Sequence, residues 1–481
     1  MYLGIDVGTS EVKILLLDRN HQQIAHASHP LEIFRPAPRH SEQQPSSWWT
    51  ATVNALGQLR AAHPVAYGAV QAIGLSGQMH GAVLLDGNHQ VLRPAILWND
   101  TRADAECLAM MAELPSLPRL AGSRAMPGFT APKLRWLAVH EPTVFGHVAK
   151  VLLPKDYVRF LLTGEFVTDM SDASGTMWLD VEKRYWSDAA LALTGLTQAH
   201  MPRLVEGSEA GGLLSAEVAK ALGLQAGIPV AGGGGDNAAS AVGMGAVEAG
   251  QGFISLGTSG VVFVVTPTYQ PNAASATHAF CHAVPNRWHQ MSVMLSAASC
   301  LQWATRLLGV SSEAVLEARA SALGPEARAQ APVFLPYLSG ERTPHNSATL
   351  RGSFHGLSHD TDASMLAYSV MEGVTFGLHD GLAALREAGS VVDRLSLVGG
   401  GACSQFWAQQ LASSLEIDIV THTGSAAGGA LGAARLAWLA DGGDINAVCT
   451  APPVDRVYHP DAGETCFLKP RYSRFRDLYA G

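Results

Sequence analysis

A strand–turn–strand pattern occurs twice in this chain, once in each half. The first copy is residues 3–10, LGIDVGTS, and the second is residues 253–260, FISLGTSG. In each copy an apolar strand enters Gly-Thr-Ser, and a second apolar strand follows, Val12 to Leu17 or Val261 to Val265. Two such copies far apart predict two similarly folded lobes that face one shared ligand. For either copy alone, an ordinary β-hairpin is the alternative interpretation.

The first turn has the chemistry that an anion requires. Residues 8–10, Gly-Thr-Ser, offer backbone N–H groups and two hydroxyls to a phosphate. Asp6 ends the strand before the turn, and Lys13 lies on the strand after it. The second copy has Ser255 in place of Asp6. Only the first lobe therefore carries a metal-type carboxylate, which predicts a phosphate cleft with one metal-side wall.

Length and composition restrict the class of protein. A chain of 481 residues is too long for one hydrophobic core, so two domains are expected. With 47% hydrophobic and 15% charged residues, the chain is a well-buried globular protein rather than a disordered one. The formal net charge of −9 argues against a nucleic-acid or membrane-surface partner.

The compartment follows by elimination. The six cysteines are scattered without a C-x-x-C pair, as expected of free thiols in a reducing compartment. The N-terminus enters a strand at once, without the basic and apolar segments of a signal peptide. The longest uncharged stretches, such as residues 249–286, are broken by Gly, Pro, Ser and Thr, so no membrane span is expected. These patterns predict a cytoplasmic protein.

Strand-like and helix-like segments alternate along the chain, which predicts an α/β fold. In the first lobe, apolar runs end in polar turns: 70–75 before 76–80, 95–98 before 99–100, 151–153 before 154–156, and 228–231 before 232–237. In the second lobe, a strand over 395–398, a glycine turn over 399–402 and helices over 406–415, 426–440 and 472–479 are expected. The absence of a long linker predicts two lobes in direct contact, residues 1–244 and 245–481.

Four consecutive glycines, residues 232–235, lead into Asp236 and Asn237. One interpretation makes Asp236 the N-cap of the following helix, a role that Asp often has. The other makes it a carboxylate at the C-terminal end of a strand, facing a cleft, where it accepts the proton of a substrate hydroxyl during phosphoryl transfer. Four glycines exceed what a turn needs, so they are expected to let a ligand approach the backbone.

A second glycine turn, residues 399–402, precedes a helix and fits backbone contact with a nucleotide near a helix N-terminus. It is not a P-loop, because no Gly-Lys-Ser/Thr follows anywhere in the chain. The first glycine turn opens a strand rather than a helix, which does not fit a dinucleotide-binding fold.

Two further polar turns suit a polyol. Residues 78–80, Gln-Met-His, and residues 98–100, Trp-Asn-Asp, each follow a strand, where α/β sheets usually place ligands. Sugar hydroxyls require hydrogen bonds, and the C–H face of a sugar requires an apolar wall. A lone His is, alternatively, a surface residue or a satisfied core residue.

Together these motifs resemble those of the FGGY carbohydrate kinases of the actin-like ATPase superfamily, over essentially the whole chain. The similar segments are residues 4–10, 76–81, 96–100, 153–157, 235–237, 255–260, 336–344 and 399–402. Within that family, segments 78–80 and 338–344 are more similar to D-xylulose kinases than to glycerol or gluconate kinases. The implied fold is α/β, with two actin-like (ribonuclease H-like) ATPase lobes and an interlobe cleft.

The resemblance implies roles position by position. Asp236 is similar to the general base of these kinases, and Asp6 to the catalytic carboxylate near the magnesium ion and the phosphates. The first lobe would bind the sugar and the second the nucleotide. The implied sugar-binding residues are Gln78, Met79, His80, Trp98, Asn99, Asp236 and Asn237. The implied nucleotide-binding residues are Gly8, Thr9, Ser10, Lys13, Gly257, Thr258, Gly400, Gly401, Ala402 and Ser404.

The chain departs from the family pattern at a few positions. Val139 and Met365 replace residues that are usually polar in the two family signatures, within segments 128–140 and 352–372, and both are expected on the surface. Glu11 lies beside the phosphate turn, where a small residue is usual. Because its negative charge is close to anionic phosphates, it is expected to point away from them.

The implied function is ATP- and Mg²⁺-dependent phosphorylation of D-xylulose to D-xylulose 5-phosphate, a step of xylose catabolism. The implied partners are the sugar and ATP, without nucleic acid or membrane, and a homodimer is compatible with the sequence. One alternative is a kinase for another pentulose or pentitol, such as D-ribulose or xylitol. Another is a non-catalytic actin-like module, a sugar sensor or chaperone-type ATPase. Asp236 argues against this last alternative, because a non-catalytic module does not need a general base.

Overall fold

Two seven-stranded sheets form the structure, one in each half of the chain. The computed structural model describes residues 1–423 and 428–480. The first sheet has the order β13-β14-β5-β1-β2-β3, with β15 also paired to β5. Its strands are β1 Tyr2–Val7, β2 Glu11–Leu17, β3 Gln23–Pro30, β5 Ala72–Gly77, β13 Ala210–Leu213, β14 Pro229–Ala231 and β15 Gly234–Gly235.

The second sheet repeats this design, with the order β18-β19-β17-β16-β22-β23-β24. Its strands are β16 Gly252–Leu256, β17 Gly260–Thr266, β18 His278–Cys281, β19 Trp288–Met294, β22 Arg394–Val398, β23 Asp418–His422 and β24 Val454–Tyr458. Each Gly-Thr-Ser copy joins an antiparallel hairpin, β1–β2 or β16–β17, and the first strand of each hairpin pairs in parallel with a later strand, β5 or β22. The matching order confirms two similarly folded α/β lobes.

Helices cover these sheets, and the remaining short strands pair in two-stranded sheets. The helices of the first half are α1 Pro45–Ala62, α2 Pro64–Gly68, α3 Asp104–Glu113, α4 Leu117–Ala121, α5 Thr130–His140, α6 Pro142–Phe145, α7 Pro154–Thr163, α8 Met170–Ser174, α9 Asp188–Ala192, α10 Ala216–Leu222 and α11 Asp236–Gly243. Those of the second half are α12 Ala298–Leu307, α13 Glu313–Ser321, α14 Pro325–Gln330, α15 Ala363–Glu387, α16 Gln405–Leu415, α17 Gly428–Ala440, α18 Ile445–Val448 and α19 Ala462–Ala480. The short strands are β4 Glu42–Gln43, β6 Val83–Leu85, β7 Ala95–Ile96, β8 Lys150–Leu152, β9 Val167–Asp169, β10 Leu179–Asp180, β11 Tyr185–Trp186, β12 Arg203–Val205, β20 Val333–Leu335 and β21 Ser353–His355.

The core of the second lobe lies between its sheet and the long helix α15. Met365, near the start of α15, is 7% exposed and belongs to this core, so its predicted surface position is wrong. The reason is local: Asp362 caps the helix by accepting from Met365 N at 2.8 Å, and the first turn of α15 is already packed. Val139 is 66% exposed, as expected.

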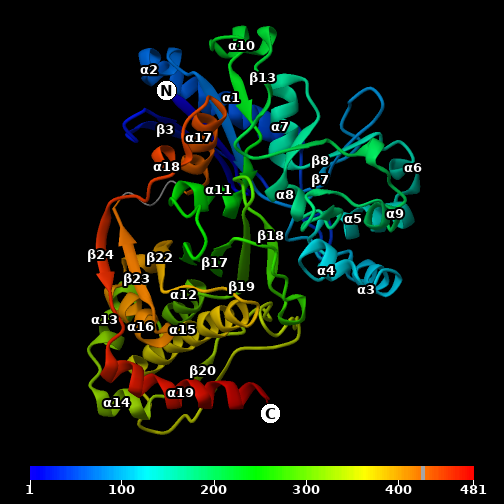
Figure 1. The fold of residues 1–481 in the computed structure, drawn as a ribbon. Coiled ribbons are helices and arrows are strands. Elements are labelled where there is room, and N and C mark those ends of the chain that lie inside the picture. The colour runs from blue at the N-terminus through cyan, green and yellow to red at the C-terminus, as the bar shows by residue number, and fades with distance from the viewer. Residues whose placement is uncertain (424–427, 481) are drawn as a thin grey trace.

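Helix α17 comes from the C-terminal part of the chain but packs on the first sheet, beside α11 (Figure 1). The contact is close because glycines lie in it. A Cβ on Gly74 of β5 would lie 1.8 Å from Ala433 O, and one on Gly432 of α17 would lie 1.7 Å from Ala239 O of α11. Of the helix expected over 426–440, residues 426 and 427 lie outside the described residues.

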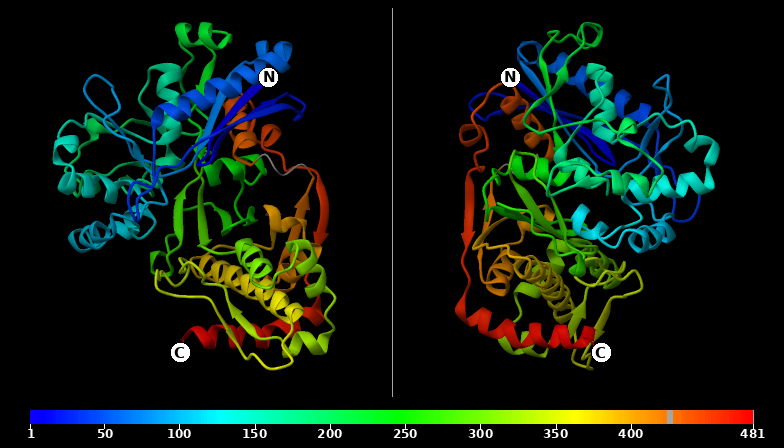
Figure 2. Two further views of the ribbon diagram at one scale, coloured as in Figure 1. Left: turned by 180° about the vertical axis from the view of Figure 1, so that it is seen from behind. Right: turned by 45° about the vertical axis from the view of Figure 1, so that its right-hand side comes forward.

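The two ends of the chain lie at opposite ends of the molecule. Met1 is in the first lobe, and α19 runs along the far side of the second (Figures 1 and 2). The division of the chain at residue 244 stays a prediction, and α17 adds to the first lobe a helix from beyond that point. Across the two described ranges, no helix has both the length and the apolar character needed to cross a membrane.

Replacing Gly74 by Ala is expected to destabilise the first lobe. The new methyl group would overlap the backbone of α17, and overpacking of this kind costs about 1–3 kcal/mol. Gly57→Ala in α1 is the matched control, because no atom lies within 4 Å of a Cβ there and Ala favours a helix. Urea unfolding measures both variants. An unchanged free energy of unfolding in Gly74→Ala would contradict the close contact.

Candidate active site

Asp236 is the first residue of α11, directly after the short strand β15. The N-cap of the helix is Gly235, so the interpretation of Asp236 as the N-cap is wrong. Its Oδ1 accepts hydrogen bonds from Asn237 N at 2.8 Å and from Asn237 Nδ2 at 3.0 Å. Oδ2 has no hydrogen-bond partner in the described part of the chain, so this oxygen is available to a substrate.

The Asp236 side chain is exposed to solvent on one side and surrounded by protein on the others. Burial raises the pKa of Asp236 to about 6; the bond from Asn237 N–H lowers this pKa, and the nearby Asp6 charge raises it. A carboxylate with such a pKa is a stronger base than a free one, yet it is mostly ionised at neutral pH.

The four glycines at 232–235 pack against protein. All four are buried, and Gly233 has a φ of 79°, in the left-handed region. A Cβ on Gly233 would lie 2.2 Å from Leu75 O, and one on Gly235 would lie 2.8 Å from Met79 Sδ. The expectation that these glycines admit a ligand is therefore wrong. They let neighbouring backbone and Met79 approach the loop that carries Asp236.

Side chains of α7 and α8 fix this loop. Arg159 of α7 donates from Nε to Ala231 O at 3.2 Å and from Nη2 to Gly232 O. Ser171 of α8 accepts at Oγ from Gly235 N at 3.1 Å. The backbone immediately before Asp236 is thus held on both sides.

A buried ion cluster supports α7 and α8. Lys155 Nζ lies 2.6 Å from Asp156 Oδ1, 2.8 Å from Asp169 Oδ1 and 3.0 Å from Asp172 Oδ2, with all four side chains fully buried. Burial lowers the pKa of Lys155, but the three carboxylates outweigh this effect and the net pKa is raised. Asp156 also pairs with Arg159 at 2.9 Å, which connects the cluster to the glycine loop. The function of segment 153–157 is therefore structural support of the Asp236 loop.

Asp6 lies near the end of β1, opposite Lys13 in β2 and beside Ser76 in β5. Burial raises the pKa of Asp6. Its Oδ1 is buried and has no hydrogen-bond partner among the residues that the structure describes. A Cβ on Gly429 of α17 would lie 2.9 Å from Asp6 Cγ, so the helix start covers this carboxylate. A buried carboxylate oxygen without a donor is suited to a cation.

The first Gly-Thr-Ser turn is fixed by side chains from the loops that are predicted to bind the sugar. Trp98 Nε1 donates to Thr9 Oγ1 at 3.0 Å, and Thr9 Oγ1 donates to Gln78 Oε1 at 3.1 Å. Gln78 Nε2 donates to Gly8 O at 3.2 Å and to Gln43 Oε1 at 2.9 Å. Gln78 is 3% exposed, and both of its amide hydrogens are used. The structure therefore corrects its predicted role: Gln78 positions the first Gly-Thr-Ser turn, and its amide hydrogens are not free for a sugar.

Glu11 forms an ion pair with Lys13 across 3.2 Å, and both side chains are partly exposed. The Ser28 hydroxyl and Lys13 hold the pKa of Glu11 below its usual range, so Glu11 is ionised at neutral pH. Its charge is paired with the cation beside the turn. Glu11 thus reduces the positive charge that Lys13 offers to a phosphate.

His80 follows β5 with a φ of 69°, in the left-handed region. Its Nδ1 lies 2.8 Å from Gly175 O, and its ring stacks on Phe129 with centroids 4.3 Å apart. Burial lowers the pKa of His80 to about 3, so the ring is neutral. Because a carbonyl faces Nδ1, the proton lies on that nitrogen, and Nε2 is an acceptor for a hydroxyl.

Three other predicted sugar residues are Met79, Trp98 and Asn99, and Met79 lies beside this ring, since a Cβ on Gly175 would contact both side chains. Met79 is 8% exposed and touches Gly235, whereas Trp98 is 44% exposed and presents an indole face. Asn99 Oδ1 is buried without a hydrogen-bond partner in the described ranges. An apolar face beside unused acceptors is the combination that a polyol requires.

Three further residues near this site, Ser123, His278 and Arg342, were not predicted from the sequence to belong to it. Ser123 Oγ lies 2.9 Å from His278 Nδ1, and the His278 ring lies 5.6 Å from Phe129. Burial lowers the pKa of His278, and the Arg342 charge lowers it further. His278 and Arg342 belong to the second lobe, whose first strand begins at Gly252. The second lobe therefore contributes side chains to the surroundings of His80 and Phe129. Arg342 lies in segment 336–344, a usable signal, whereas no sequence pattern connects His278 with a sugar site.

A cavity of about 710 Å³ lies between α11 and the loops that follow the strands of the second sheet. Its lining includes Asn237, Ser240, Ser255, Gly400, Ala402 and Tyr458. Gly400 and Ala402, which are predicted to contact the nucleotide, therefore line this cavity. Asn237, predicted on the sugar side, lines this cavity instead, directly beside Asp236.

Two predicted nucleotide residues are engaged in protein contacts. Gly401 is buried, and a Cβ there would lie 2.4 Å from Leu256 Cγ. Ser404 caps α16, because its Oγ accepts from Trp407 N at 3.0 Å and donates to Glu317. These two residues shape the glycine turn rather than line the cavity.

The second Gly-Thr-Ser turn is held by the start of α12. Ala298 N donates to Gly257 O at 2.8 Å, and Ala297 N donates to Thr258 O at 2.9 Å. Ser299 Oγ donates to the same Thr258 oxygen at 2.7 Å. The carbonyls of this turn are thus directed to α12.

Comparison with known families identifies the chain. Residues 1–243 match the N-terminal domain of the FGGY family of carbohydrate kinases, and residues 252–440 match its C-terminal domain. The chain belongs to the FGGY family of carbohydrate kinases. The predicted resemblance is thereby confirmed, and the cavity beside Asp236 lies in a kinase.

Relatives and solved structures are similar to this FGGY kinase over essentially its whole length. A xylulose kinase of Escherichia coli (strain K12) is 49% identical, covering 100% of this chain and 98% of its own. A crystal structure of a xyloylose kinase from Brucella ovis has a TM-score of 0.96 at 48% identity, covering 100% of this chain and 98% of that chain. A gluconate kinase from Lactobacillus acidophilus has a TM-score of 0.93 at 25% identity, covering 99% and 96%. The fold alone therefore does not distinguish the sugar.

Glu11→Gln is expected to lower the KM of this FGGY kinase for ATP by about two- to fivefold, the effect of a partly exposed ion pair. The reason is that Lys13 loses its partner and offers its full charge to the phosphates. Glu165→Gln, an exposed residue whose change alters net charge equally, is the control. Steady-state kinetics with varied ATP measure both. An unchanged or raised KM in Glu11→Gln would show that Lys13 does not face ATP.

Proposed function

We propose that this FGGY kinase transfers the γ-phosphoryl group of ATP to D-xylulose, forming ADP and D-xylulose 5-phosphate. The position of Asp236 carries the proposal. The residue before Asp236 contacts Met79 of the sugar loop, and the residue after it lines the nucleotide-sized cavity. A base between a polyol site and a nucleotide site is what phosphoryl transfer to a hydroxyl requires.

The chemical step follows from this placement. As the sugar oxygen forms its bond to the γ-phosphorus, the bond from phosphorus to the β–γ bridging oxygen breaks, and ADP leaves. Asp236 Oδ2 takes the proton of the sugar hydroxyl, since Oδ1 is occupied by Asn237. His80 Nε2 and Asn99 Oδ1 accept hydrogen bonds from other hydroxyls, and Trp98 covers the C–H face.

Mg²⁺ is the expected partner of the ATP phosphates. The described residues contain no group of three or more His, Cys, Asp or Glu that could hold a metal alone. A single carboxylate such as Asp6 is compatible with Mg²⁺, which usually takes one or two carboxylates and completes its shell with water and phosphate oxygens. Asp6, with its unpartnered buried oxygen, would hold the ion. When bound, Mg²⁺ neutralises phosphate charge during transfer.

The identity of the sugar rests on sequence similarity more than on fold. The relative from E. coli, a xylulose kinase, is 49% identical over essentially its whole length. Because a gluconate kinase has nearly the same fold, a kinase for another pentulose or for a pentitol is the second candidate. The exposed carboxylate with a raised pKa favours either kinase over a non-catalytic sugar sensor.

An ADP-release assay over D-xylulose, D-ribulose, xylitol, gluconate and glycerol tests the proposal. We expect the highest kcat/KM with D-xylulose and little ADP release without sugar. Phosphorus NMR of the product should show a phosphate on the terminal carbon. A higher kcat/KM with any other acceptor would replace D-xylulose in the proposal, and ADP release independent of all acceptors would reject the sugar kinase.

Asp236→Asn is expected to lower kcat by about 10²–10⁴-fold, the usual contribution of a general base, with an unchanged melting temperature. In the wild type, kcat/KM should fall as the pH decreases through about 6, because protonation removes the base. Asp188→Asn, an exposed aspartate at the start of α9, is the control. Near-normal kcat in Asp236→Asn, or the same acidic limb in that variant, would remove Asp236 from the mechanism.

A further inference from the structure

We propose that Lys133 is a positioning residue of the sugar site, which fixes the loop ending in His80 against the strand end that carries Trp98. The inference rests on the proposed function for the identity of the sugar. Lys133 belongs to segment 128–140, one of the two family signatures, and the catalytic step described above does not use it.

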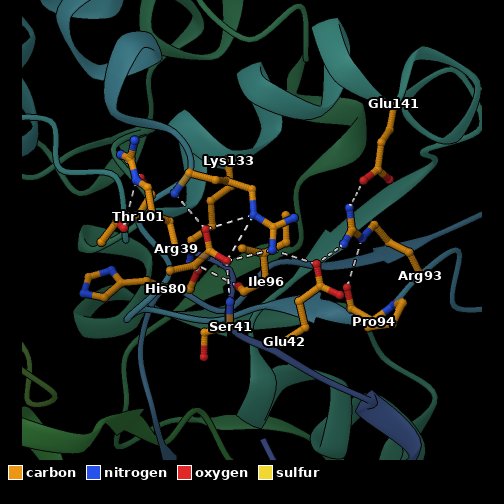
Figure 3. Close-up of polar contacts among 12 residues, drawn as sticks. Arg39, Ser41, Glu42, His80, Arg93, Pro94, Ile96, Thr101, Lys133 and Glu141 are labelled. Atoms are coloured by element: carbon orange, nitrogen blue, oxygen red, sulfur yellow. Dashed lines mark hydrogen bonds and ion pairs between the residues drawn. The ribbon is translucent and has the colours of Figure 1, made fainter. Parts of the chain in front are cut away.

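The Lys133 amine contacts the backbone of both sugar segments. Its Nζ donates to His80 O at 3.0 Å and to Ile96 O at 3.1 Å (Figure 3). Thr130, one turn earlier in α5, donates from Oγ1 to the same His80 oxygen at 3.1 Å. One face of α5 therefore holds the carbonyl of a residue whose backbone is left-handed.

No carboxylate of the described residues pairs with the Lys133 amine, so its hydrogen bonds go to these two carbonyls. Lys133 is fully buried and forms no salt bridge with a described residue. Asp100, the nearby carboxylate, instead accepts from Ser41 N at 2.6 Å and pairs with Arg102 at 2.7 Å. Burial lowers the pKa of Lys133 well below its usual value, and the Asp100 charge opposes this. Charged or neutral, the amine has N–H groups for both carbonyls.

A buried amine without a carboxylate partner is costly for folding. An unbranched apolar side chain of similar length would fill the same space at lower cost. The two carbonyls would also keep one donor each, because Thr130 donates to His80 O and Ala82 N donates to Ile96 O. Stability thus gives little reason for a lysine here, whereas the geometry of the two sugar segments does.

The Trp98 side of the site has its own support. Glu42 of β4 pairs with Arg102 at 2.7 Å and with Arg93, and Arg93 pairs with Glu141 at 2.5 Å. Figure 3 shows Arg93 between Glu42 and Glu141, beside Pro94. This chain of ion pairs fixes the segment before Trp98. Lys133, together with the bond from Ala82 N to Ile96 O at 3.1 Å, then holds that segment against the loop that ends in His80.

Lys133→Met tests the inference in the full-length enzyme. We expect the KM for D-xylulose to rise at least tenfold, the KM for ATP to stay within twofold, and the melting temperature to stay equal or increase. Thr130→Val, which removes the other donor to His80 O, should raise the sugar KM by a smaller factor. Thr375→Val, a buried threonine in the core of the second lobe that bonds Met371 O at 2.9 Å, controls for loss of a buried hydrogen bond.

The outcomes separate the two proposals. If the wild-type enzyme phosphorylates another acceptor better than D-xylulose, the proposed sugar is replaced, and Lys133 is tested with that acceptor. An unchanged sugar KM in Lys133→Met overturns the positioning role. So does a parallel loss of kcat, both KM values and melting temperature, which a structural residue would give. If Lys133→Met does not fold, a sugar KM in Thr130→Val equal to that in Thr375→Val overturns it instead.

Discussion

The contact of α17 with β1, β5 and α11 is the constraint on which the site depends. Gly429, at the start of α17, lies against Asp6, and Gly432 lies against Ala239, three residues after Asp236. Because glycine removes the side chain from this contact, main chain packs directly on main chain, and little can adjust in between. The two carboxylates and the cavity wall at Gly428 are therefore placed relative to one another by backbone packing.

Two buried lysines then support the loops that carry the site, and they do so in opposite electrostatic settings. Lys155 lies among three aspartates that keep it charged, and it holds the helices that fix the Asp236 loop. Lys133 has two carbonyls as partners, and burial lowers its pKa. The first arrangement offsets the cost of burying a charge with opposite charges, and the second with hydrogen bonds alone.

Local patterns in the sequence were sufficient for the fold class, the duplicated hairpins and Asp236 at a strand end, because each depends on neighbouring residues. The errors concern contacts between distant segments. Gln78 fits a polyol loop by sequence, but Gln43 and Gly8 use its amide. Met365 was expected on the surface because a polar residue is usual at that position in the family, but the second-lobe core covers it. His278 reaches the sugar wall from the second sheet, which no local pattern indicates.

The two lobes share a topology, but different contacts hold their Gly-Thr-Ser turns. In the first, side chains hold the Gly-Thr-Ser turn: Trp98 donates to Thr9, and Thr9 donates to Gln78. In the second, mainly the main chain of α12 holds the turn, through the carbonyls of Gly257 and Thr258. Trp98 is also 44% exposed and belongs to the proposed polyol site. One hydrogen bond therefore connects the proposed polyol site to the Gly-Thr-Ser turn in the first lobe. The second turn has no such side-chain link to the polyol site among the described residues, so its geometry depends on the packing of α12.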